Sequence, residues 1–243
     1  MPPDTVIGVD CATVAKAVGL ARARRMHGRW RLLEATVGSA ERLPAAVLTD
    51  WLREEPEALL ALDAPLGWPA ALGHVLANHA AGEPIAVPIE RMFQRVTDHD
   101  VRSRTSKRPL EVGADRIART AWATLALLAE LRAANGHALP LAWDTTVPDA
   151  PAAIEVYPAA TLRAHGLPAS GYKEPHAAAR AAIDAWVRNR IDLPAGLDLV
   201  GGVGHVLDAV LCVVAGLDFL AGEAPGPEDP ETARREGWIW VRG

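Results

Sequence analysis

Residues 5–10 read Thr-Val-Ile-Gly-Val-Asp, a short apolar run that ends in an acid. Residues 19–24 then alternate apolar and basic side chains, which is typical of a half-exposed strand. Residues 29–35 form a third candidate strand, and Gly28 marks the turn before it. Three closely spaced strands with short connections predict an antiparallel meander at the start of the chain.

A helix and an apolar strand are expected after the meander. Apolar residues recur at helical spacing from Leu43 to Leu52, and Ser39 is the expected N-cap. Residues 58–62 are all apolar and lead into Asp63. Because this run shows no alternation, it fits a central strand that is covered on both faces. The order strand, helix, strand predicts a parallel crossover.

A long excursion separates this strand from the next one. Within it the sequence predicts a weak helix in 67–82, no clear period in 85–110, a strong helix over 114–135 and a proline-rich loop over 143–151.

The last third of the chain returns to shorter elements. The patterns predict a strand over 153–157, a helix over 176–190, a buried helix over 203–221 and a closing strand over 237–241. We therefore expect one α/β domain over residues 1–243, with a helical insertion at about 66–150.

Composition excludes several classes of protein. The chain has 243 residues, a net charge of −5, 50% hydrophobic residues and 23% charged residues, which is unlike a disordered chain. Its two cysteines make neither a disulfide framework nor a zinc site. The apolar stretch 203–221 contains His205, Asp208 and Asp218 and is a poor membrane span. Residues 1–4 lack the pattern of a signal peptide, so we expect a cytoplasmic protein.

Four acids lie where a charge is costly. Asp10 and Asp63 end apolar runs, Glu155 follows another, and Asp208 lies inside the apolar segment 204–211. A carboxylate moved out of water costs several kcal/mol unless it is paired, protonated or bound to a cation. No basic residue lies within three positions of Asp63, Glu155 or Asp208.

These acids have ordinary interpretations when they are taken one at a time. Asp10 or Asp63 alone could close an Asx turn, and Glu155 could face water from an edge strand. Together, strand ends and one buried helix can reach the same edge of a sheet. We therefore expect the carboxylates of Asp10, Asp63 and Asp208 to lie within about 8 Å of one another and to share Mg²⁺ or Mn²⁺, with Glu155 as a fourth ligand.

The order of these elements and acids resembles the ribonuclease H-like fold. More closely, the chain resembles a prokaryotic family of predicted nucleases with that fold, catalogued as domain of unknown function 429. The motifs that carry the resemblance are Ile7-Gly8-Val9-Asp10, Leu62-Asp63-Ala64-Pro65-Leu66-Gly67-Trp68-Pro69, Arg95-Val96-Thr97-Asp98, Ile154-Glu155-Val156-Tyr157-Pro158, His205-Val206-Leu207-Asp208-Ala209 and Glu236-Gly237-Trp238-Ile239-Trp240.

The resemblance implies a mixed five-stranded sheet flanked by helices, with the helical insertion between the fourth and fifth strands. It also implies a divalent-metal-dependent nuclease that hydrolyses phosphodiester bonds of DNA or RNA by a two-metal mechanism. His205 and Asp208 are three residues apart and share a helix face. This spacing resembles the last motif of Holliday-junction resolvase-like nucleases, which implies that His205 is a metal ligand or orients the attacking water. The alternative is a histidine at a helix start that is satisfied by backbone.

The most basic stretch runs from 91 to 108 and contains five Arg and one Lys against two Asp. One interpretation is an arm whose Arg91, Arg95, Arg102 and Arg104 contact the phosphates of a nucleic acid. The other is a solvated loop with internal Arg–Asp pairs. The second is supported by a general arginine excess, 22 Arg to 3 Lys, that is typical of a GC-rich genome.

Two other functions fit the same core. An actin-like or sugar-kinase-like protein that uses ATP shares these strands, and Asp10-Cys11-Ala12-Thr13 has a vague likeness to its first phosphate loop. Cys11 replaces the expected glycine there, and no Asp-Gly-Gly loop follows a later strand. A nucleic-acid-binding module without catalysis is the third hypothesis, and the complete set of acids argues against it.

Overall fold

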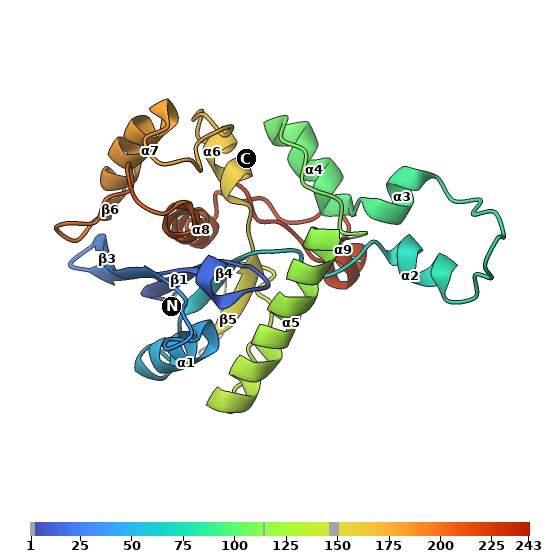
Figure 1. The fold of residues 1–243 in the computed structure, drawn as a ribbon, viewed down its shortest axis with the longest axis horizontal. Coiled ribbons are helices and arrows are strands. Elements are labelled where there is room, and N and C mark those ends of the chain that lie inside the picture. Colours follow the sequence, from blue (N-terminus) through green and yellow to red (C-terminus); the bar gives the residue numbers. More distant parts are fainter. Residues whose placement is uncertain (1–2, 114, 146–150) are drawn as a thin grey trace.

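The computed structural model describes residues 3–113, 115–145 and 151–243. In this part of the chain, one mixed six-stranded sheet in the order β5-β4-β1-β2-β3-β6 lies between two layers of helices (Figure 1). The strands are β1 (Thr5–Asp10), β2 (Gly19–Met26), β3 (Arg29–Val37), β4 (Leu59–Asp63), β5 (Ala152–Glu155) and β6 (Ile191–Asp192).

The predicted meander is present. β1 pairs antiparallel with β2, and β2 pairs antiparallel with β3. On the other side of β1, β4 runs parallel to it, and β5 runs parallel to β4. The helix α1 (Pro44–Glu54) makes the crossover from β3 to β4. The carboxyl ends of β1, β4 and β5 therefore meet at one edge of the sheet.

The two faces of the sheet bury two separate apolar clusters because side chains alternate along each strand. Val6 and Ala61 point into a cluster that includes the helix α8 (Gly204–Leu220). Ile7 and Leu62 point into a cluster with α1 and with the helix α5 (Asp115–Asn135). Figure 1 shows α8 on one side of the sheet and α1 and α5 on the other.

Two strand glycines determine how closely α8 approaches the sheet. A Cβ on Gly8 would overlap the backbone oxygen of Ala209, and a Cβ on Gly19 would overlap the backbone oxygen of His205. Glycine at these positions lets the helix backbone lie directly on β1 and β2. The first turns of α8 are thereby held over the carboxyl end of β1, which ends in Asp10.

The predicted number of five strands is wrong by one. The sixth strand, β6, has two residues and pairs parallel with the edge strand β3 through Trp30 and Arg31. A strand this short carries no alternation that a sequence pattern could reveal. The predicted closing strand 237–241 forms only an isolated bridge, between Ile239 and Glu155. Its other hydrogen bonds include one from the Ile239 N–H to the Thr97 side chain, at 2.8 Å.

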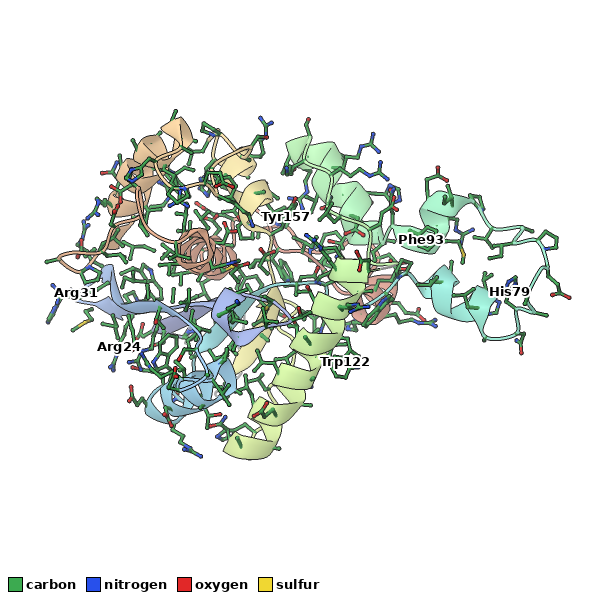
Figure 2. All side chains as sticks on the ribbon, viewed as in Figure 1. Arg24, Arg31, His79, Phe93, Trp122 and Tyr157 are labelled. Carbon is green, nitrogen blue, oxygen red and sulfur yellow. The ribbon has the colours of Figure 1, made fainter. Side chains whose placement is uncertain are left out.

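The excursion between β4 and β5 is more helical than its pattern indicates. It contains α2 (Ala70–Leu76), α3 (Ile89–Phe93), α4 (Val96–Thr105) and α5. α3 and α4 lie in the stretch where no period was expected, since little of either helix is apolar and buried. Figures 1 and 2 show α2 and α3 projecting from the body of the molecule, with His79 at the far end. Residues 146–150 of the predicted proline-rich loop lie outside the described residues.

Glu236, the last residue of α9 (Pro230–Glu236), ties this excursion to the end of the chain. Its carboxylate accepts the backbone N–H of Ala70 at 2.7 Å and that of Val96 at 2.8 Å. These are the first residues of α2 and α4, so one buried carboxylate binds two helix N-termini, where negative charge is favourable.

Helix α1 begins at Pro44 after Leu43, so Ser39 is not its N-cap. The helices α6 (Pro158–Ala164) and α7 (Ala178–Arg188) complete the layer around α8.

Candidate metal centre

Asp10 and Asp63 are neighbours across the parallel pair β1–β4, because the register places these two strand ends opposite each other. Alternation turns both side chains to the face that α8 covers. Asp208, in the second turn of α8, faces them from above. One carboxylate oxygen from each of the three residues lies within 4.8 Å of the others. The expectation that these three acids converge is confirmed.

Asp208 is the most deeply buried of the three, with no exposed surface. The Tyr172 hydroxyl donates a hydrogen bond of 2.7 Å to its Oδ1. The Lys173 ammonium forms an ion pair with its Oδ2. Both partners come from the loop between α6 and α7, 36 and 35 positions away along the chain. The absence of a basic residue close in sequence therefore did not exclude an ion pair.

Without a cation, the carboxylates of Asp10, Asp63 and Asp208, called the triad below, repel one another. Burial, followed by repulsion from Asp10 and Asp208, raises the pKa of Asp63 well above its usual range. Burial also raises the pKa of Asp208, although Lys173 opposes the shift. Burial, the largest single influence, would lower the pKa of Lys173, but the pairing with Asp208 and the attraction to Asp63 and Asp10 together raise it. Three acids this close favour either bound protons or a bound cation.

His205, in the first turn of α8, lies beside this group. Its Nδ1 is 2.6 Å from Oδ2 of Asp10, and this hydrogen bond raises the pKa of His205. The side chain is 44% exposed, so the ring is open to solvent while one nitrogen holds Asp10. The structure thus brings His205 to the acids, and its partner is a carboxylate rather than backbone.

Glu155 does not join the other acids. It lies opposite Leu62 in the β4–β5 register, one position before Asp63, so alternation turns it to the other face of the sheet. There its two oxygens accept hydrogen bonds from the Arg95 guanidinium at 2.7 and 2.9 Å. It also accepts the backbone N–H of Leu66 at 3.0 Å. Glu155 is therefore part of a buried ion pair.

The four arginines of the predicted basic arm differ in their partners and in their exposure. Arg95 is 1% exposed and binds Glu155 and Asp98, so its guanidinium has no surface for a phosphate. Arg104 pairs with Asp100 and donates to the backbone oxygen of Val241 at 2.9 Å. Arg91, on α3, and Arg102, on α4, are exposed and form no ion pair within the described residues. The expectation of internal Arg–Asp pairs is confirmed for two of the four arginines.

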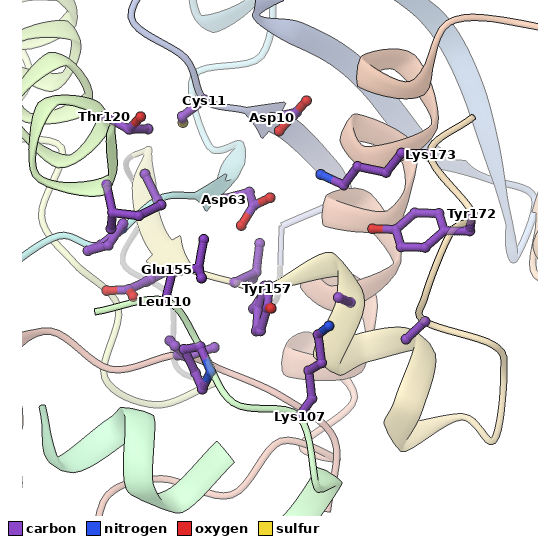
Figure 3. A pocket seen from close by; sticks show the side chains of 18 of the residues that line it. Asp10, Cys11, Asp63, Lys107, Leu110, Thr120, Glu155, Tyr157, Tyr172 and Lys173 are labelled. Carbon is purple, nitrogen blue, oxygen red and sulfur yellow. The ribbon is translucent and has the colours of Figure 1, made fainter. Parts of the chain in front are cut away.

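A cavity of about 670 Å³ opens over Asp10 and Asp63 (Figure 3). Residues of the loop after α4, of α5, of α6 and of the loop 169–174 form its walls. Lys107 and Lys173 are both among its lining residues. The chain has 3 lysines against 22 arginines, so two of its three lysines line this one cavity. That scarcity was the one sequence signal that could have singled out these two residues.

Arg180 fixes the loop that brings Lys173 to the cavity. It is fully buried and has no acidic partner in the described part of the chain. Instead its guanidinium donates hydrogen bonds to two separate segments. One set goes to the backbone oxygens of Tyr172 and Lys173, and the other goes to those of Leu199, Val200 and Gly202. Its guanidinium therefore joins the loop 172–173 to the segment that leads into α8, and so fixes Lys173 relative to Asp208. Nothing in the sequence pattern distinguished it from the other arginines.

Within the described residues, no helix is both long enough and apolar enough to span a membrane. No curated protein matches the chain. Among solved structures, the chain is similar to T. thermophilus RuvC in complex with Holliday junction substrate, with 16% identity and a TM-score of 0.42 over 92% of this chain and 99% of that one. A model of the family described as "Protein of unknown function (DUF429)" matches residues 8–232, and the chain belongs to that family.

Proposed function

We propose that the protein is a nuclease that uses Mg²⁺ or Mn²⁺ to hydrolyse phosphodiester bonds of DNA or RNA. The observation that carries this proposal is the convergence of Asp10, Asp63 and Asp208 within 4.8 Å beside the cavity. Carboxylates that come from three separate elements, at this separation, are a ligand set that suits a hard divalent cation. The family supports the proposal through the resemblance of its motifs.

The residues present fit such a cation. All three ligand groups are carboxylate oxygens, which Mg²⁺ and Mn²⁺ prefer. The raised pKa values of Asp63 and Asp208 mark a site where added positive charge would be stabilising. When bound, a divalent cation polarises a phosphoryl oxygen and makes a water molecule a stronger nucleophile.

The side chains of the site take distinct roles in this proposal. Asp10, Asp63 and Asp208 hold the cation, and Tyr172 keeps Asp208 in place through its hydroxyl. His205 orients Asp10 through Nδ1 and can exchange a proton at its other ring nitrogen. Glu155, which is neutralised by Arg95, stabilises the sheet edge and holds no cation. The three carboxylates can share one or two hydrated cations, and two are what the proposed two-metal mechanism uses.

Phosphate recognition falls to the cavity lysines and to the exposed arginines. The whole chain carries a charge of −5, so a polyanion needs local positive groups. Lys107 lines the cavity and forms no ion pair among the described residues. Arg91 and Arg102 are the exposed arginines of the basic stretch that form no ion pair among the described residues, whereas the exposed Arg108 is paired with Glu111.

The test is cleavage of labelled single-stranded, duplex, hybrid and junction substrates in Mn²⁺. We expect the wild type to cleave at least one of them and to lose activity when the metal is chelated. Asp10→Asn and Asp63→Asn should each reduce turnover by about 100-fold or more, because each removes a ligand of the catalytic cation.

Asp50→Asn is the matched control. Asp50 is a surface acid on α1 whose side chain is 70% exposed, and its replacement should leave cleavage unchanged. Cleavage by Asp10→Asn at the wild-type rate would overturn the proposal. ATP in the same panel tests the actin-like alternative, and substrate binding without cleavage would favour the binding module.

A further inference from the structure

Lys173 binds the same carboxylate that the proposed cation needs. Its ammonium is paired with Oδ2 of Asp208, and that oxygen receives no hydrogen bond of regular geometry within the described residues. The other oxygen, Oδ1, is already taken by the Tyr172 hydroxyl. Oδ2 is therefore the less occupied oxygen of Asp208 and the better one for a cation, and it is the one that Lys173 now neutralises.

The side chain of Lys173 is exposed although its backbone is fixed. Arg180 binds the backbone oxygens of Tyr172 and Lys173, and Arg180 has no exposed surface. The Lys173 side chain, by contrast, is 59% exposed and lines the cavity. A fixed backbone and an exposed stem of four rotatable carbons allow the ammonium to leave Asp208 and still remain within the cavity.

Resting on the metal site proposed above, we propose that Lys173 is an exchangeable cation of the triad. In the metal-free protein it neutralises Asp208. When a divalent cation takes Asp208, the ammonium is displaced into the cavity, where it binds a phosphate of the substrate. Lys173 is thus both a competitor of the metal and a ligand of the substrate.

The chemistry of lysine suits this exchange. An ammonium is a compact point charge with three rotatable donors, so it gives up one carboxylate oxygen and takes a phosphate oxygen without a fixed geometry. Arginine would hold a carboxylate through two parallel hydrogen bonds and would release it less readily. The residue at this position is lysine in a chain with 22 arginines and 3 lysines.

The first test measures Mn²⁺ binding to the full chain by calorimetry, without substrate. We expect Lys173→Met to bind Mn²⁺ about tenfold tighter than the wild type, because the metal no longer displaces an ammonium. Lys107→Met is the matched control: it removes a lysine from the same cavity that is not paired with Asp208, and it should leave the Mn²⁺ affinity unchanged.

The second test follows the lysine itself in the wild-type protein, and a conservative variant serves only to assign its signal. Reductive dimethylation with ¹³C keeps the positive charge and gives one signal for each of the three lysines. Addition of Mg²⁺ should shift the Lys173 signal and leave that of Lys16, outside the cavity, in place. Lys173→Arg identifies the signal by its loss.

The third test measures substrate binding. In Ca²⁺, Lys173→Met should bind a labelled single-stranded oligonucleotide more weakly than the wild type, although it binds metal more tightly. Opposite changes in the two affinities are a signature that a merely structural lysine would not produce.

The outcomes separate the two proposals. A wild type that binds no Mn²⁺ overturns the metal site and the exchange together. A wild type that binds Mn²⁺, with Lys173→Met binding equally or more weakly, overturns the exchange and leaves the metal site standing. A Lys173 signal that does not shift in saturating Mg²⁺ also overturns the exchange and leaves the metal site standing. An oligonucleotide affinity of Lys173→Met equal to that of the wild type overturns the role of Lys173 in phosphate binding.

Discussion

At the scale of single residues, the acids of this protein differ in what neutralises each of them. Asp10 is paired with His205, Asp208 with Lys173, and Glu155 with Arg95. Asp63 has no ion pair among the described residues, and it is repelled by Asp10 and Asp208. It is therefore the acid that most needs a cation, and the one whose charge most destabilises the metal-free protein.

We expect Asp63→Asn to stabilise the metal-free protein at neutral pH by about 1 kcal/mol, or roughly 2–4 °C in Tm. A carboxyl whose pKa is raised by folding binds more protons when folded. Its contribution to stability therefore falls as the pH rises from the unfolded pKa, about 4, through the raised folded value. The gain should be largest at pH 7 and should vanish near pH 4.

Thermal unfolding in a chelator between pH 4 and pH 8 measures this effect, with Asp50→Asn as the control for a surface acid. With Mg²⁺ added, the wild type should gain stability by mass action and Asp63→Asn should gain less. A stability gain for Asp63→Asn that is the same at every pH would contradict the repulsion argument.

Arg95 gives a prediction of opposite sign. We expect Arg95→Met to destabilise the protein by about 3–5 kcal/mol, because it leaves the buried charges of Glu155 and Asp98 without their partner. Arg102→Met, on the exposed side of the same region, should change stability by no more than about 0.5 kcal/mol.

Urea unfolding of the two variants measures the difference. Adding Glu155→Gln to Arg95→Met should recover part of the stability, since one of the unpaired charges is then gone. Equal stability of Arg95→Met and Arg102→Met would show that the buried pair contributes nothing.

At the scale of elements, strand register separates Glu155 from the triad. The sequence places all three strand acids at carboxyl ends, but β5 ends opposite Leu62 and β4 ends one residue later. A shift of one residue turns a side chain to the other face of a sheet. The end of a strand is predicted from a sequence only to within about 2–4 residues. That margin is larger than the one residue that decides which face of the sheet Glu155 takes.

The close approach of α8 to β1 gives the prediction at this scale. We expect Gly8→Ala to destabilise the protein by about 3 kcal/mol or more, because the new methyl group meets the backbone of α8 rather than a flexible side chain. If α8 shifts away from β1 to make room for this methyl group, Asp208 should move away from Asp10 and Mn²⁺ binding should weaken. Gly73→Ala, in α2 with open space around it, should be neutral or stabilising by up to about 1 kcal/mol.

Urea unfolding and Mn²⁺ calorimetry on the same samples check both effects. The prediction is wrong if Gly8→Ala unfolds at the same urea concentration as Gly73→Ala.

At the scale of the whole molecule, the sequence predicted the architecture better than the partners of its charged residues. The meander, the crossover and the buried helix follow from periodicity, and they place Asp10, Asp63 and Asp208 together. Periodicity contains no information on contacts between distant positions. The partners of Asp208 and Glu155 lie about 35 and 60 positions away, and only the fold brings them in.

With a net charge of −5, the molecule could bind the proposed nucleic acid only through local basic groups. We expect the double variant Arg91→Ala and Arg102→Ala to weaken nucleic-acid binding, and to lower the slope of log affinity against log salt by about one unit for each phosphate that an arginine no longer neutralises. Arg31→Ala with Arg53→Ala removes the same charge from β3 and α1 and should change neither quantity. Turnover at saturating substrate should stay near that of the wild type, because these arginines bind the ground state and the transition state alike. Filter binding across a salt series, alongside turnover at each salt concentration, provides the measurement. An affinity and slope equal to those of the wild type would make α3 and α4 a solvated surface, and would leave phosphate recognition to Lys107 and Lys173 alone.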